Sequence, residues 1–122
     1  MANILLVDDH ENLREVISIF LKDNGHTITE ACDGHQAIQC YKNMRFDVVV
    51  LDIIMPNKDG VETIAELRQI NADVRIIAIS GGGSLVSPEI CLEMAKSLGV
   101  KQVLRKPFNL QQLEECIFAE LV

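Results

Sequence analysis

The side chains of this 122-residue sequence that are best suited to chemistry each follow a short run of apolar residues. Such runs are typical of strands that are buried on both faces of a parallel sheet. Because the carboxyl ends of parallel strands form the ligand-binding edge of an open α/β sheet, we expect these side chains to meet there. Three carboxylates, a hydroxyl and an ammonium group can together hold a divalent cation and a phosphoryl group. The residues are Asp8 and Asp9 after residues 4–7, Asp52 after residues 48–51, Ser80 after residues 76–79, and Lys106 shortly after residues 103–104.

Strand-like and helix-like patterns alternate along the chain and predict the scaffold for these side chains. In the first predicted helix, Leu13, Val16 and Ile17 have the spacing of one buried face, and in the third helix Arg68 is the only polar residue on that face. The alternation predicts one α/β domain over residues 1–122, a flavodoxin-like, doubly wound parallel sheet of five βα units with the strand order 2-1-3-4-5. The expected strands are residues 4–7, 27–32, 47–52, 74–80 and 101–105, and the expected helices lie within residues 13–24, 37–44, 61–68, 91–98 and 110–121.

The composition excludes several classes of function. Hydrophobic residues make up 48% of the chain, which is typical of a folded domain, and the net charge is −7. A surface this acidic disfavours direct binding to nucleic acid or to anionic lipid. The sequence has no stretch of ~20 apolar residues and no signal-peptide pattern. We therefore expect a cytoplasmic protein with no membrane insertion and no direct contact with nucleic acid.

Three familiar ligand motifs are incomplete in this sequence. His10 and Glu11 match the start of a zinc-protease motif, but Arg14 stands in the place of its second histidine. The four cysteines form no Cys-x-x-Cys pair, so we expect them to act as small apolar residues rather than as zinc ligands. Residues 81–84, Gly-Gly-Gly-Ser, lack the Gly-Lys-Ser/Thr ending of a phosphate-binding P-loop.

The order of the acidic pair, Asp52, Ser80 and Lys106-Pro107 resembles the receiver domain of bacterial two-component response regulators, especially the chemotaxis type. The similarity covers essentially the whole chain, and it includes residues 55–60, Met-Pro-Asn-Lys-Asp-Gly, which follow Asp52. The resemblance implies that Asp52 accepts a phosphoryl group from a histidine kinase, a phosphotransfer protein or a small phosphodonor. It also implies a regulatory domain that catalyses only its own phosphorylation and slow dephosphorylation, not an enzyme with a separate substrate.

The acidic residues are the predicted metal ligands. Consecutive strand residues point to opposite faces, so Asp8 and Asp9 can converge only where the chain turns. The resemblance implies that Asp8, Asp9, Asp52 and the backbone carbonyl of Ile54 hold Mg²⁺, which prefers oxygen ligands and relieves the repulsion between neighbouring carboxylates. Asp9 can also cap the following helix, a common role for aspartate, and one residue can have both roles.

The remaining site residues are predicted to bind the phosphoryl group or to shape the pocket. A carboxylate such as Asp52 can act as the nucleophile toward phosphorus. The resemblance implies that Ser80 and Lys106 bind phosphoryl oxygens and that the bond between Lys106 and Pro107 is cis. Gly60 is expected to provide the turn into the helix over residues 61–68.

The sequence departs from the resembling family at Val103, where an aromatic residue or histidine usually switches between two positions. Valine is too short and too stiff at χ1 for that movement. We therefore expect residues 81–88 and the start of the next helix to move instead. A downstream protein is expected to bind the face formed by residues 91–98, 101–105 and 110–121, where Phe118 and Val122 lie off the predicted buried stripe.

Two other functions are compatible with parts of the sequence. A degenerate receiver would bind a protein partner without phosphorylation. A haloacid-dehalogenase-type phosphatase also uses an aspartate after a buried strand, but it requires Asp-x-Asp, and Ile54 occupies the second position. The chain is expected to be either a single-domain regulator or a receiver excised from a longer protein.

Overall fold

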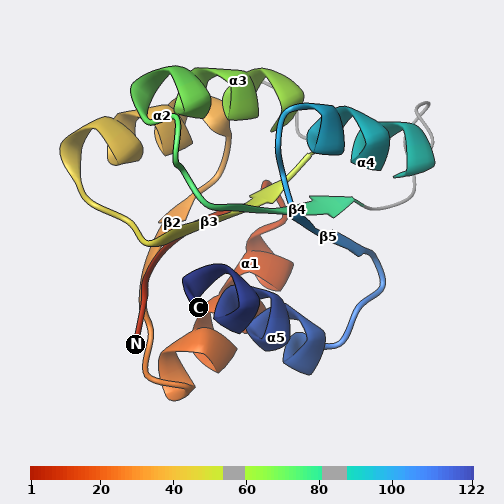
Figure 1. Cartoon of the computed structure of the whole chain (residues 1–122). Coiled ribbons are helices and arrows are strands. Elements are labelled where there is room, and N and C mark those ends of the chain that lie inside the picture. The colour runs from red at the N-terminus through yellow and green to blue at the C-terminus, as the bar shows by residue number, and fades with distance from the viewer. Residues whose placement is uncertain (54–59, 81–87) are drawn as a thin grey trace.

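The protein folds as a parallel five-stranded sheet between two layers of helices (Figure 1). The structure, a computed structural model, describes residues 1–53, 60–80 and 88–122. The strand order is β2-β1-β3-β4-β5, so the predicted doubly wound topology is confirmed. In chain order the elements are β1 (Asn3–Val7), α1 (Glu11–Asp23), β2 (Thr27–Ala31), α2 (Gly34–Asn43), β3 (Val48–Asp52), α3 (Gly60–Ile70), β4 (Ile76–Ser80), α4 (Pro88–Ser97), β5 (Gln102–Arg105) and α5 (Leu110–Leu121).

The apolar runs form strands because both faces of the sheet are covered. Helices α2, α3 and α4 lie on one face, and α1 and α5 lie on the other (Figure 1). Successive residues of a strand point to opposite faces. In β1, Leu5 therefore packs on the side of α2 and α3, while Ile4 and Leu6 pack on the side of α1 and α5. All five residues of β3 are buried, which requires an uninterrupted apolar run ending at Asp52.

The helices differ from the predicted pattern in the faces that they bury. Val16 was predicted to be buried but is 52% exposed, whereas Ser18 is 2% exposed. In α3 the buried side contains Leu67 rather than Arg68. Apolar residues spaced three and four apart fit more than one rotation of a helix, and only the contact with the sheet selects one of them.

Arg68 has a structural role at the end of α3. Its guanidinium donates hydrogen bonds to the backbone carbonyls of Leu98 at 3.0 Å, Ala72 at 3.2 Å and Val74 at 2.9 Å. A charged donor is well suited to carbonyls at the ends of helices and strands. The side chain therefore joins the ends of α3 and α4 to the segment that leads into β4.

Local signals begin and end the helices that flank the sheet. Helix α1 is followed by Asn24 and by Gly25, which has a left-handed φ of +93°, a conformation typical of a helix end. Helix α5 begins with a capping box, in which the side chain of Asn109 accepts a hydrogen bond from the backbone of Gln112 and the side chain of Gln112 accepts one in return. The capping box directs the chain into α5 just after Lys106 and Pro107.

Candidate functional site

The predicted site residues lie at one edge of the sheet. Asp52 and Ser80 are the last residues of β3 and β4, while Asp8 directly follows β1 and Lys106 directly follows β5. In the pairing of β3 with β4, Asp52 lies opposite Ile79, and in the pairing of β4 with β5, Ser80 lies opposite Arg105. Strands that are separated in the sequence therefore bring these side chains to the carboxyl edge, which is the ligand edge of this kind of sheet.

The acidic residues form a compact group at this edge. One ligand atom from each of Asp8, Asp9, His10 and Asp52 lies within 4.8 Å of all the others. Asp8 is 1% exposed and Asp52 is 2% exposed, so their charges are held away from bulk water. His10 was not predicted to belong to this group, although it directly follows the acidic pair in the sequence.

The turn after β1 brings Asp8 and Asp9 to the same side. The backbone of Asp8 still donates to Ala31 of β2 at 3.2 Å, and its Oδ1 accepts a hydrogen bond from the backbone N–H of His10 at 2.8 Å. Arg14 donates to the carbonyl of Asp8 at 2.8 Å, which stabilises this turn. His10, not Asp9, occupies the cap position of α1, so the expected role of Asp9 as the cap is wrong.

Lys106 provides a positive charge close to the acidic group. Its Nζ lies 3.0 Å from Oδ2 of Asp52 and 3.7 Å from Oδ2 of Asp8. Its backbone N–H donates to the carbonyl of Ser80 at 2.7 Å, and the peptide bond to Pro107 is cis. Buried carboxylates require such a partner, because an isolated buried charge is strongly unfavourable.

Several oxygen atoms at this edge are buried without a hydrogen-bond partner among the described residues. They are Oδ2 of Asp8, Oδ1 of Asp9 and Oγ of Ser80. Buried polar atoms in folded proteins nearly always have a partner, so atoms such as these mark a place where a ligand fits. Carboxylate oxygens suit Mg²⁺, which also keeps several water molecules, and the Ser80 hydroxyl can donate to an anionic oxygen.

Gly60 packs closely against the backbone at the end of β3. Its N–H donates to the carbonyl of Ile53 at 2.7 Å. A Cβ atom at this position would lie 2.7 Å from the carbonyl oxygen of Ile53 and 2.9 Å from that of Asp52. Only glycine leaves room for the backbone next to Asp52. The turn that was predicted before Gly60 falls in residues 54–59, outside the described residues, and stays a prediction.

Some predicted features cannot be placed. Ile54, the predicted carbonyl ligand, and the rest of residues 54–59 lie outside the described residues, as do residues 81–87, which were expected to move. Val103 is described and is partly buried against the core that lies under α2, α3 and α4. Its role as a position without the usual aromatic switch stays a prediction.

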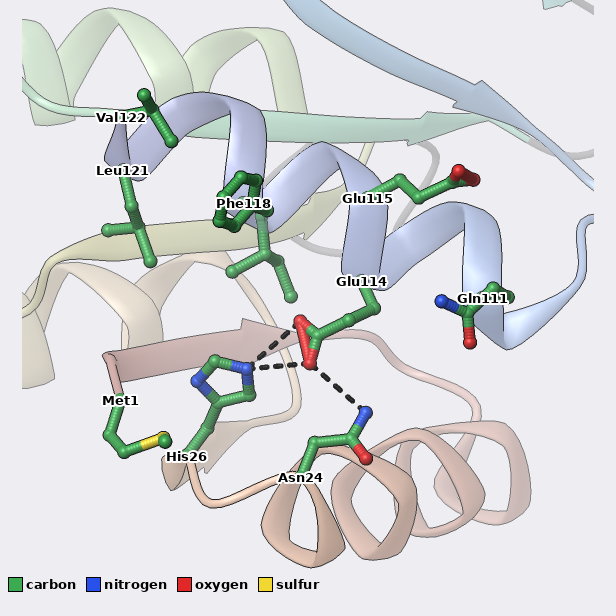
Figure 2. A pocket seen from close by; sticks show the side chains of 10 residues that line it. Met1, Asn24, His26, Gln111, Glu114, Glu115, Phe118, Leu121 and Val122 are labelled. Carbon is green, nitrogen blue, oxygen red and sulfur yellow. Dashed lines mark hydrogen bonds and ion pairs between the residues drawn. The ribbon is translucent and has the colours of Figure 1, made fainter.

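One of the two exposed α5 residues assigned to the predicted docking face lies on a different side of the helix. Phe118 is 66% exposed and Val122 is 89% exposed, as their position off the buried stripe predicted. Phe118 lines a cavity of about 650 Å³ together with Met1 and His26 (Figure 2). Glu114, one turn earlier in α5, pairs with His26 at 2.8 Å. Phe118 therefore lies on the α1 side of α5, while the predicted docking face uses the side near α4 and β5.

The comparison with known families agrees with this arrangement. A family model described as the response regulator receiver domain matches residues 4–118. The chain belongs to the response regulator receiver family. It is 38% identical over 117 residues to the chemotaxis protein CheY of Bacillus subtilis (strain 168), covering 93% of this chain and 92% of that protein. It is 36% identical over 112 residues to the response regulator MprA of Mycobacterium sp. (strain KMS), covering 92% of this chain but 47% of MprA, about half of its length.

Solved receiver structures superpose closely on this one. The chemotaxis protein CheY4 of Vibrio cholerae has a TM-score of 0.88 and 31% identity, with 99% of both chains covered. TrrA of Thermotoga maritima, solved in complex with Mg²⁺ and BeF, has a TM-score of 0.82 and 30% identity, with 99% of this receiver and 100% of TrrA covered. Among the described residues, none of the helices has the length and apolar character that crossing a membrane requires.

Proposed function

We propose that this receiver is a phosphorylation-dependent signalling switch in which Asp52 accepts the phosphoryl group. The observation that carries the proposal is the position of Lys106, whose Nζ lies 3.0 Å from the buried carboxylate of Asp52. Asp8 and Asp9 complete an anionic group beside it. A nucleophilic carboxylate next to a fixed ammonium and a cation site is the arrangement that phosphoryl transfer requires.

The proposed reaction forms one bond and breaks one bond at phosphorus. A carboxylate oxygen of Asp52 attacks the phosphorus atom, and the bond to the donor's histidine nitrogen, or to the oxygen of a small phosphodonor, breaks with its electron pair. Asp8, Asp9 and Asp52 would hold Mg²⁺, which supplies positive charge to the phosphoryl oxygens when bound. Lys106 is close enough to Asp52 to contact a phosphoryl oxygen after transfer, and the hydroxyl of Ser80 can donate to another.

The phosphoryl group then changes the protein's affinity for a partner. A ligand shifts a two-state element only by interacting differently with its two states. Ser80 and Lys106 lie at the ends of β4 and β5, and Lys106 donates to the Ser80 carbonyl at 2.7 Å, so both strand ends respond together. We infer that the change reaches residues 81–88 and the α4–β5–α5 face, to which a downstream protein binds. Slow self-dephosphorylation in the cytoplasm would return the domain to its resting state.

The test is phosphorylation by acetyl phosphate in the presence of Mg²⁺, followed by intact mass measurement. The wild-type protein should gain one phosphoryl group that hydroxylamine removes, and Asp52→Asn should gain none. Asp23→Asn is a matched control, because Asp23 is an exposed aspartate at the far end of α1. Equal mass gain in Asp52→Asn would refute the assignment, and no gain in the wild-type protein would favour the degenerate receiver.

A further inference from the structure

His10 has a side chain whose position the start of α1 does not explain. The residue occupies the cap position of the helix, yet its side chain makes no capping hydrogen bond. Residues with short polar side chains are preferred there, because they accept hydrogen bonds from the first turn. The side chain of His10 is 66% exposed, and its Nδ1 lies 3.4 Å from Oδ1 of Asp8 and 3.4 Å from Oδ1 of Asp9.

These two distances fit shared coordination of a metal ion better than they fit hydrogen bonds. A good N–H···O hydrogen bond has a length of about 2.7–3.2 Å, so 3.4 Å is long for one. Nitrogen and oxygen atoms that bind one tetrahedral ion at about 2.1 Å lie about 3.4 Å apart. The distance from the imidazole nitrogen to each carboxylate oxygen therefore equals the distance expected between two ligands of one tetrahedral metal ion.

A second observation points to a cation at the same place. Oδ1 of Asp9, the atom that lies 3.4 Å from Nδ1 of His10, is buried and has no hydrogen-bond partner among the described residues. Asp8 is 1% exposed, and its other oxygen, Oδ2, also has no hydrogen-bond partner there. A positive group, Nζ of Lys106, lies 3.7 Å from Oδ2 of Asp8, which is long for a hydrogen bond. A buried carboxylate oxygen that is satisfied so weakly is stabilised when a cation binds next to it.

We propose that His10 supplies a nitrogen ligand to a cation held by Asp8 and Asp9, so that the pocket also binds Zn²⁺ and Co²⁺. This inference rests on the acidic pocket being a cation site, as in the proposed function. Imidazole suits transition metals, whereas Mg²⁺ prefers oxygen ligands and keeps its water. His10 therefore raises the affinity for Zn²⁺ and Co²⁺ and leaves the affinity for Mg²⁺ almost unchanged, and these ions compete with Mg²⁺ for the pocket.

The test is calorimetric titration of the full chain with Zn²⁺, Co²⁺ and Mg²⁺ separately. We expect His10→Asn to bind Zn²⁺ and Co²⁺ at least about tenfold more weakly than the wild type, since even indirect loss of ligand support costs about 10–100-fold. Its affinity for Mg²⁺ should change by less than about twofold. Asparagine is a good cap residue, so this variant keeps the start of α1 intact. His35→Asn is the matched control, because His35 is an exposed histidine of α2.

A spectroscopic readout separates coordination from an indirect effect. In the wild-type protein, Zn²⁺ should shift the imidazole nitrogen resonances of His10, and Mg²⁺ should leave them in place. Equal Zn²⁺ affinity of the wild type and His10→Asn would overturn the inference, as would Zn²⁺ binding that survives in Asp9→Asn. Phosphorylation with Mg²⁺ is measured on the same variants. If it proceeds normally while His10→Asn binds Zn²⁺ like the wild type, the proposed function stands and only the role of His10 fails.

Discussion

Replacing Lys106 with methionine removes a positive charge close to the buried carboxylates and keeps most of the aliphatic stem. Nζ of Lys106 lies 3.0 Å from Asp52 and 3.7 Å from Asp8. The variant therefore leaves a group of mutually repelling carboxylates without the ammonium group that pairs with Asp52 and Asp8. We expect the variant to be less stable without metal and to gain more stability from Mg²⁺ than the wild-type protein gains.

The size of the effect follows from these distances. At an effective dielectric constant of about 20, the attraction is about 5.5 kcal/mol for the 3.0 Å pair and about 4.5 kcal/mol for the 3.7 Å pair. Desolvation offsets most of this attraction, and breaking a buried pair typically costs about 3–5 kcal/mol. Because the Lys106 side chain is 20% exposed, we expect the lower end, about 3 kcal/mol, or about 10 °C in Tm.

The assay is urea denaturation of the wild type and Lys106→Met, each with EDTA or with saturating Mg²⁺. In EDTA the variant should unfold at lower urea, and Mg²⁺ should recover a large part of the difference, because a bound ion stabilises the folded state according to its affinity. Lys101→Met is a suitable control, since Lys101 is exposed just before β5. The double variant Asp52→Asn with Lys106→Met should lose less stability than Lys106→Met alone, because one repelling carboxylate is removed.

Two results would contradict this reasoning. If Lys106→Met were as stable as the wild type in EDTA, the ammonium group would not stabilise the acidic group in solution. If Mg²⁺ stabilised both proteins equally, the cation and Lys106 would not act on the same carboxylates. The slope of the denaturation curve must stay unchanged for either comparison to report stability alone.

Three further predictions concern residues outside this pair. Gly60→Ala should lower the stability by about 1–3 kcal/mol and slow phosphorylation of Asp52, because a new Cβ displaces the backbone beside that residue. An unchanged Tm and phosphorylation rate would show that the backbone accommodates the new Cβ without cost. Arg68→Met should cost about 1–3 kcal/mol in thermal melts through the loss of its backbone hydrogen bonds, with an unchanged yield of phosphorylated protein; a changed yield would link this distant end of the sheet to the site. Burial, followed by the nearby charges of Glu115 and Glu120, raises the pKa of the Cys116 thiol. Its thiolate fraction is therefore reduced at pH 8, and iodoacetamide should label it more slowly than an unfolded control, as peptide mass measurement will show.

The sequence was sufficient to predict the sheet and the residues at its ligand edge. A strand covered on both faces must be apolar at consecutive positions, so a change from an apolar run to Asp52 or Ser80 also marks where the strand ends. Parallel strands bring all their carboxyl ends to one edge, whichever loops connect them. For these reasons, residues from four separate parts of the chain could be assigned to one group without any knowledge of distances.

The rotation of each helix was decided only by tertiary packing. The spacing in α1 allowed Val16 to be buried, but contact with the sheet selected a face that includes Ser18. The same limit applies to Phe118, which the sequence placed off the buried stripe. The pairing of Glu114 with His26 showed that this side of α5 is turned toward α1. Helical periodicity reports which residues share a face, but it does not report which neighbour that face meets.

The tertiary structure alone also revealed how the backbone shapes the site. Gly60 was predicted to provide a turn, and the structure adds a feature that the sequence did not indicate: its backbone closely approaches the backbone of Asp52 and Ile53. His10 was considered only as part of an incomplete zinc motif, and the turn after β1 places its ring 3.4 Å from both carboxylates. Such contacts depend on distances between chain segments that fold onto one another, and residue type and spacing carry no information about those distances.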